Sequence, residues 1–166
     1  MARLPRIPKN LNLFVDGVGK AGWIDTLNYP NLALVTAEHR AGGMDAAVDY
    51  DMGMEKLDLG FVLSDPDEQV FSVLGRPGIR YIARSAIQRP EEPAEALIVT
   101  MTGMLKQANM GEQTPGEKQT IDLMANLTYY KLQVNGEVVV EIDIPNMVRN
   151  IGGEDQLAAQ RAALGL

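Results

Sequence analysis

The sequence predicts a mainly β fold, a β-sandwich or barrel with a short flanking helix and a second helix at the C-terminus. Three observations carry this prediction. Short apolar runs are separated by turn signals drawn from 16 glycines and 9 prolines, which are spread along the chain. Residues 55–63 alternate between apolar and polar side chains, as a half-buried strand does. Asn135-Gly136, between two further alternating runs, is the strongest short-range signal for a hairpin.

The first half of the chain predicts strands, one long loop and one helix. Asp16-Gly17 is a two-residue hairpin signal. Ser64 or Asp65 is expected to cap the helix, which has Pro66 in its first turn and ends at Gly75. The predicted elements are, in order, strands at 12–15, 18–27 and 31–40, a loop at 41–55, a strand at 55–63 and a helix that ends before residue 75.

The second half predicts a meander of strands that ends in a helix. Pro90 and Pro93 mark the turn between its first two strands, and Pro115-Gly116 marks the turn of its loop. The terminal helix is rich in alanine and has acids at its start, where the helix dipole favours them. The predicted elements are strands at 78–88 and 94–107, a loop at 108–118, a hairpin over 120–144 and a helix at 156–164.

The Asn135-Gly136 turn also predicts a register. A plain two-residue loop pairs Val134 with Glu137 and, further along, Tyr130 with Glu141. One face of the hairpin is then mostly apolar. The other is wet and acidic and carries Glu137, Glu141 and Asp143.

Composition excludes several classes of protein. The chain has 166 residues, 46% of them apolar and 22% charged, which is ordinary for one globular domain spanning residues 1–166. It has no cysteine, so disulfides and thiolate metal sites are excluded, and His39 is its one histidine. With 15 basic and 22 acidic residues, the net charge of −7 disfavours tight binding to nucleic acid. No apolar run reaches 18 residues and the N-terminus lacks the pattern of a signal peptide, so we expect no membrane anchor.

Three motifs resemble binding or catalytic sites, but each lacks residues or structure that such a site requires. Residues 17–22 match G-x-G-x-x-G, yet no room follows for the helix that must receive a pyrophosphate. Asp49, Asp51 and Gly53 begin like a calcium loop, but its later positions fail. His39 has no serine in a nucleophile-elbow motif to activate. We therefore expect no catalytic residue, no metal and no cofactor, and the chain is not expected to be an enzyme.

The loop at about 41–55 is the strongest candidate for a contact with another chain. It is much longer than a hairpin turn needs. Its methionines are apolar and would be unfavourably exposed to water unless another chain covers them. Its glycine pair lets the loop turn away from the parent sheet. Its aspartates can form ion pairs with basic residues of another chain. The residues assigned to this assembly loop are Gly42, Gly43, Met44, Asp45, Asp49, Asp51, Met52 and Met54.

Several stretches together resemble the major tail tube proteins of contractile-tailed phages and the related tube proteins of R-type bacteriocins. They run in order from one end of the chain to the other, and the densest match is 129–137. The stretches that carry the resemblance are 10–17, 38–45, 110–112, 115–117, 129–137, 141–143, 146–147 and 155–166.

The resemblance implies a structural virion protein that assembles, in the host cytoplasm, into hexameric rings stacked as the inner tube of a contractile tail. Implied partners are other copies of the chain, the tail sheath protein, a tape measure protein in the lumen, and tube initiator and terminator proteins. Double-stranded DNA would pass without specific binding. A ring of six carries 6 × −7 = −42 formal charges, and Glu137, Glu141 and Asp143 are the candidate lumen-facing acids.

Two alternatives remain open from the residues. One is a tube protein of a type VI secretion system, which has the same architecture with effectors as cargo. The other is a monomeric β-barrel that binds a small ligand, which requires an apolar interior cavity and a monomeric mass in solution.

Overall fold

The computed structural model describes residues 4–166, which are mostly β-strand with two short helices. The mainly β prediction, with a flanking helix and a C-terminal helix, is therefore confirmed. The first seven elements are β1 (Ile7–Val15), β2 (Val18–Gly19), β3 (Ile24–Asn28), β4 (Leu34–His39), β5 (Val48–Met54), β6 (Asp58–Leu63) and α1 (Glu68–Ser72). The remaining elements are β7 (Ile79–Gln88), β8 (Glu95–Asn109), β9 (Ile121–Val134), β10 (Glu137–Asp143), β11 (Val148–Ile151), β12 (Glu154–Asp155) and α2 (Ala158–Leu164).

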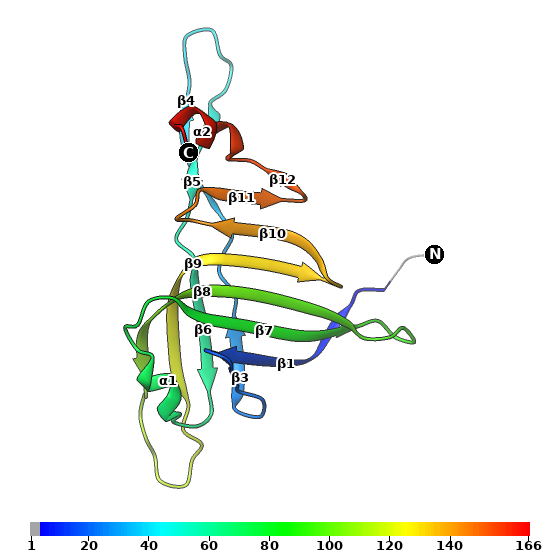
Figure 1. Ribbon diagram of the computed structural model, residues 1–166, viewed down its shortest axis with the longest axis vertical. Helices are drawn as coiled ribbons and strands as arrows, with labels where there is room; N and C mark the ends of the chain where they lie inside the picture. The colour runs from blue at the N-terminus through cyan, green and yellow to red at the C-terminus, as the bar shows by residue number, and fades with distance from the viewer. Residues whose placement is uncertain (1–3) are drawn as a thin grey trace.

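Ten strands form one antiparallel sheet, in the order β12-β11-β10-β9-β8-β7-β1-β2 with β6 and β3 branching from β9 (Figure 1). The branch arises because β9 is long. Residues 121–126 of β9 pair with β6, and residues 129–134 pair with β10 on the same edge. The sheet therefore bends around one core instead of lying flat.

β8 and β9 bend together at Gly103, where the register between them shifts. A Cβ atom on Gly103 would lie 2.0 Å from the backbone oxygen of Asn126, so only glycine fits this approach. The inward side chains of the bent sheet, among them Leu13, Phe61 and Tyr81, are almost fully buried. Burial of this apolar face is what stabilises the body of the subunit.

Helix α1 is fixed to the body by a buried ion pair. Asp67 is its N-cap: one carboxylate oxygen accepts a hydrogen bond from the amide of Gln69, at 2.9 Å. The other contacts the ammonium of Lys20, which also donates to the side chain of Gln69 at 2.7 Å. The predicted caps, Ser64 and Asp65, are wrong, because the helix starts where this buried aspartate meets its cation.

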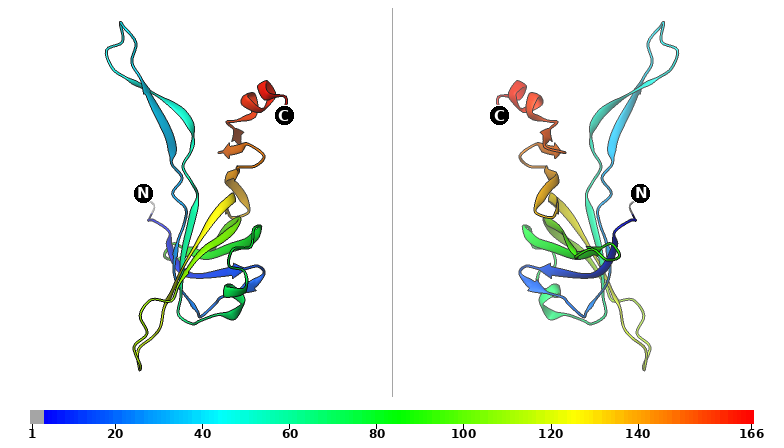
Figure 2. Two further views of the ribbon diagram at one scale, coloured as in Figure 1. Left: turned by 90° about the vertical axis from the view of Figure 1, so that its left-hand side faces the viewer. Right: turned by 90° about the vertical axis from the view of Figure 1, so that its right-hand side faces the viewer.

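Two further predictions on the first half need correction. The single strand at 18–27 is two strands, because a turn at residues 20–23 carries Lys20 to Asp67. Residues 48–54, predicted as part of a loop, form strand β5 and pair with β4 in a separate two-stranded sheet. We call residues 34–54 the arm, since they project from the body as one hairpin (Figure 2).

The Asn135-Gly136 hairpin is confirmed, with both residues at the positive φ that a type I′ turn requires. Its predicted register holds next to the turn, where Val134 pairs with Glu137 and Gln133 pairs with Val138. A bulge at Val139 shifts the rest, so that Tyr130 lies opposite Ile142 and not Glu141.

Candidate assembly surface

The arm has one apolar and one acidic face. Paired residues of antiparallel strands share a face, so His39 lies with Val48 and Ala37 lies with Tyr50. The rings of His39 and Tyr50 meet edge to face, with centroids 5.9 Å apart. On the opposite face Glu38 pairs with Asp49 and Thr36 with Asp51.

Large apolar side chains of the arm are exposed to water. Tyr50 is 55% exposed and Met52 is 64% exposed, and Val48 and Val35 are about as open. An isolated two-stranded hairpin is marginally stable in water. An exposed apolar face of this kind is typical of a surface that another chain covers.

The base of the arm is held by an ion pair between Asp51 and Arg149 of β11. The carboxylate of Asp51 also accepts a hydrogen bond from the amide of Gly53, at 2.8 Å. Arg149, followed by the Gly53 amide, holds the pKa of Asp51 below its ordinary value. The Arg149 guanidinium is buried, and its Nε has no hydrogen-bond partner within residues 4–166.

The tip of the arm turns back on itself. Gly43 adopts a φ of 89°, in the left-handed region that favours glycine. Arg40 donates to the carbonyl oxygen of Met44 at 3.2 Å, and the amide of Ala41 lies 3.2 Å from the Met44 sulfur. Gly42 and Asp45 are exposed at this tip.

The predicted assembly residues therefore fall into three places. Four lie at the tip, namely Gly42, Gly43, Met44 and Asp45, and three lie along β5, namely Asp49, Asp51 and Met52. Met54 lies at the base and packs partly against the core, so it is not an exposed adhesive residue.

A groove of about 670 Å³ separates the base of the arm from the C-terminal part of the chain. Its lining is mostly apolar and includes Met54, Ile144, Met147 and Leu157, with Arg149 at one wall. Methionine side chains adapt to partners of irregular shape. The groove is open and separate from the core, so it does not supply the interior cavity that a ligand-binding barrel requires.

The three candidate lumen acids do not share one face. Glu141 lies opposite Lys131 and Asp143 opposite Tyr129, on the polar side of the sheet. Glu137 lies opposite Val134, before the bulge at Val139, and the bulge leaves it on the other side of the sheet from the two later acids. The expectation of a common wet face is wrong for Glu137.

The two acids on the polar side are held by neutral groups. Tyr129 donates to the carboxylate of Glu141 at 2.6 Å, and burial together with that acid raises the Tyr129 pKa to about 12. Asp143 accepts two hydrogen bonds from Asn146, one from its backbone amide and one from its side chain.

This side of the sheet is mixed in charge and not purely acidic. By register it also carries Arg80 and Arg84 of β7 and Lys131 of β9. The sequence prediction missed these cations because it considered only the hairpin over 120–144. The alternation of residues 78–88 places Arg80 and Arg84 on one face and would have revealed them.

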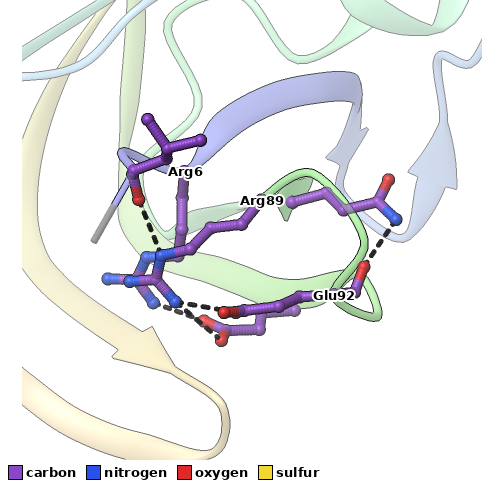
Figure 3. Close-up of polar contacts among 6 residues, drawn as sticks. Arg6, Arg89 and Glu92 are labelled. Carbon is purple, nitrogen blue, oxygen red and sulfur yellow. Dashed lines mark hydrogen bonds and ion pairs between the residues drawn. The ribbon is translucent and has the colours of Figure 1, made fainter. Parts of the chain in front are cut away.

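The start of β1 is tied to the turn between β7 and β8 by a cluster of ion pairs (Figure 3). Arg6 contacts Glu95, and Arg89 lies 3.0 Å from Glu92 and 3.9 Å from Glu95. Arg89 also donates to the carbonyl oxygen of Leu4, at 2.9 Å. In the part of the chain that is described, no helix is long and apolar enough to cross a membrane.

The structure thus presents a bent sheet with an exposed hairpin arm and a mixed-charge polar side. The match to known sequences gives the family. Residues 5–165 match the model of the family described as phage tail tube protein FII, and the chain belongs to it. It is a structural tail tube subunit, as predicted, and neither alternative is favoured.

Two relatives support this assignment. The chain is 27% identical over 170 aligned positions to the tail tube protein of Escherichia phage P2, covering 98% of this chain and 99% of that protein. It is 28% identical over 155 positions to the major tail tube protein of Serratia phage KSP20, covering 90% and 91%.

Solved structures with the same fold come from contractile injection systems. One comes from the sheath/tube terminator of the extracellular contractile injection system PVC in its extended state, with a TM-score of 0.60 and 6% identity over 80% of this chain and 99% of that one. Another comes from the PVC sheath-tube complex, with a TM-score of 0.58 and 9% identity over 78% and 91%. At these identities the likeness concerns the fold.

Proposed function

We propose that residues 1–166 act as one tail tube domain that assembles into hexameric rings, and that the rings stack into the inner tube of a contractile tail. The exposed arm carries this proposal. It presents large apolar side chains to water on a hairpin that the body does not cover. A covering subunit would bury them and would also order the hairpin.

The tube is a conduit for DNA delivery and penetrates the cell envelope when the sheath contracts. We infer contacts with the tail sheath protein, with initiator and terminator proteins at the tube ends, and with a tape measure protein in the lumen. Structures with this fold from a sheath/tube terminator and from a sheath-tube complex support the contacts with the sheath and the terminator. We place assembly in the cytoplasm of the host bacterium.

The lumen is proposed to be acidic, and Glu141 and Asp143 are its nominated acids. A net charge of −7 for each subunit supports this assignment, because DNA adsorbs where lysine and arginine replace its counterions. Arg80, Arg84 and Lys131 share that side of the sheet. These cations would offset the two nominated acids, so the net negative charge of the lumen would depend on further acids of the subunit.

Shortening the arm tests the proposal. Replacing residues 37–50 with a two-residue Asn-Gly turn retains Asp51, Gly53 and Met54, which join the arm to the body. The shortened subunit should keep its Tm and circular dichroism and should form no tubes in negative-stain images. Normal tubes from the shortened subunit would overturn the role of the arm, and a strictly monomeric wild-type chain at all concentrations would overturn the proposal itself.

A further inference from the structure

Strand β1 has an open edge over most of its length. On one side it pairs with β7 from Ile7 to Val15. On the other side it pairs with β2 at Phe14 and Val15 alone. On that side the amide of Lys20 also donates to the carbonyl oxygen of Leu13, at 2.8 Å. Within residues 4–166, the stretch 7–12 thus has no strand on its second side, and such an edge is a template for a strand from another chain.

A shallow groove of about 490 Å³ lies next to this open edge and crosses β1, β7 and the start of β8. Small residues dominate its lining, so the backbone of a second chain can approach closely. The residues that matter are Asn10, Ala21, Gly22, Arg84, Ala86 and Ala96.

The uncompensated charge of the groove is positive. Glu95 also lines it, but Arg6 and Arg89 contact that carboxylate (Figure 3). Arg84 is exposed, and no ion pair joins it to any group in the part of the chain that is described. An anionic partner would therefore meet a free guanidinium, the side chain best suited to carboxylates.

The arm has the complementary properties. Glu38 and Asp49 lie directly opposite each other. Neither acid forms an ion pair among residues 4–166. Both edges of the two-stranded arm are free, because β4 and β5 pair with each other and with no other described strand. The arm projects away from the body (Figure 2), so the arm that fills the groove must come from another copy.

We propose that the arm of one subunit docks in the β1-edge groove of the next, adds a strand beside β1, and pairs Glu38 and Asp49 with Arg84. This inference rests on the proposed tube function and names its contact surfaces. The arm and the groove are different surfaces, so the contact is head-to-tail and builds a ring or a helical stack.

Cross-linking tests the contact directly, because the chain has no cysteine of its own. The double variant Arg84→Cys/Asp49→Cys, treated with a short bismaleimide after assembly, should give a ladder of covalent oligomers on denaturing gels. The matched control is Arg80→Cys/Asp49→Cys. Arg80 is exposed on the same face of the same strand but lies outside the groove, so its ladder should be at least tenfold weaker. Equal ladders from the two variants, both seen to assemble in negative-stain images before cross-linking, would overturn the inference.

Charge reversal gives a second readout. Arg84→Glu should raise the subunit concentration needed for sedimentable assemblies at least tenfold, while Arg80→Glu should change it less than threefold. Adding Glu38→Arg and Asp49→Arg to Arg84→Glu should restore assembly to within threefold of wild type. Wild-type behaviour of Arg84→Glu would refute the docking site and leave the tube function standing, whereas a wild-type chain that never assembles would refute the function first.

Discussion

Strand β6 of the body and strand β5 of the arm have the same alternating pattern but different surroundings. In β6, Leu59, Phe61 and Leu63 are buried, and the residues between them are half-buried. In β5, Val48, Tyr50 and Met52 alternate with Asp49 and Asp51, and all five are exposed. The body is stabilised by its own chain, whereas the apolar half of β5 has no cover in the subunit. Alternation thus predicts a strand without showing which chain will cover it.

The largest expected effect separates the two regions by truncating one aromatic side chain in each. Phe61→Ala removes a buried ring that packs against Tyr81, at 6.0 Å between ring centroids, and should lower the free energy of unfolding by about 3–5 kcal/mol. Tyr50→Ala should change the stability of the unassembled subunit by less than about 0.5 kcal/mol while it weakens assembly. Urea unfolding of dilute subunits, beside sedimentation of concentrated ones, measures both. A stability loss of similar size in the two variants would break the comparison.

The two ion pairs give the next contrast, because one is buried and the other lies at the base of the arm. Lys20→Met leaves the carboxylate of Asp67 buried beside a helix N-terminus and should destabilise the subunit by about 3 kcal/mol. Lys20→Met/Asp67→Asn removes the charge and keeps a capping side chain, so most of the loss should be recovered. Arg149→Met leaves Asp51 in contact with water, so thermal unfolding should show a smaller loss. A double variant no more stable than Lys20→Met would contradict this reading of the buried pair.

The sequence predicted secondary-structure elements well where the residues of the element itself determine its conformation. Asn135-Gly136 forms its turn because both positions need positive φ. Strand β5 was missed although residues 48–54 alternate, because aspartates and a glycine at every second position were interpreted as a solvated loop. The bulge at Val139 could not be predicted, since no glycine or proline marks it in the run from Glu137 to Asp143. Arg149 was missed because its partner, Asp51, is 98 positions away in the sequence.

The smallest expected effect concerns the attachment of the arm to the body. The folded-state pKa of Asp51 lies below its ordinary value of 3.8, because Arg149 and the Gly53 amide favour the carboxylate. A depressed pKa stabilises the folded arrangement fully above the unfolded value, and that contribution is lost as the pH falls through the folded value. The Gly53 amide of dilute, unassembled subunits should therefore be protected from hydrogen exchange at pH 6 and lose relative protection below about pH 3.8, while core amides such as that of Phe61 keep theirs. Arg149→Met should remove the difference between the two pH values, and Asp49→Asn, one residue pair further along the same face, should leave it unchanged. If Gly53 loses protection in step with the core, the arm is not attached by this ion pair, and the separation between a self-sufficient body and a dependent arm is wrong at its junction.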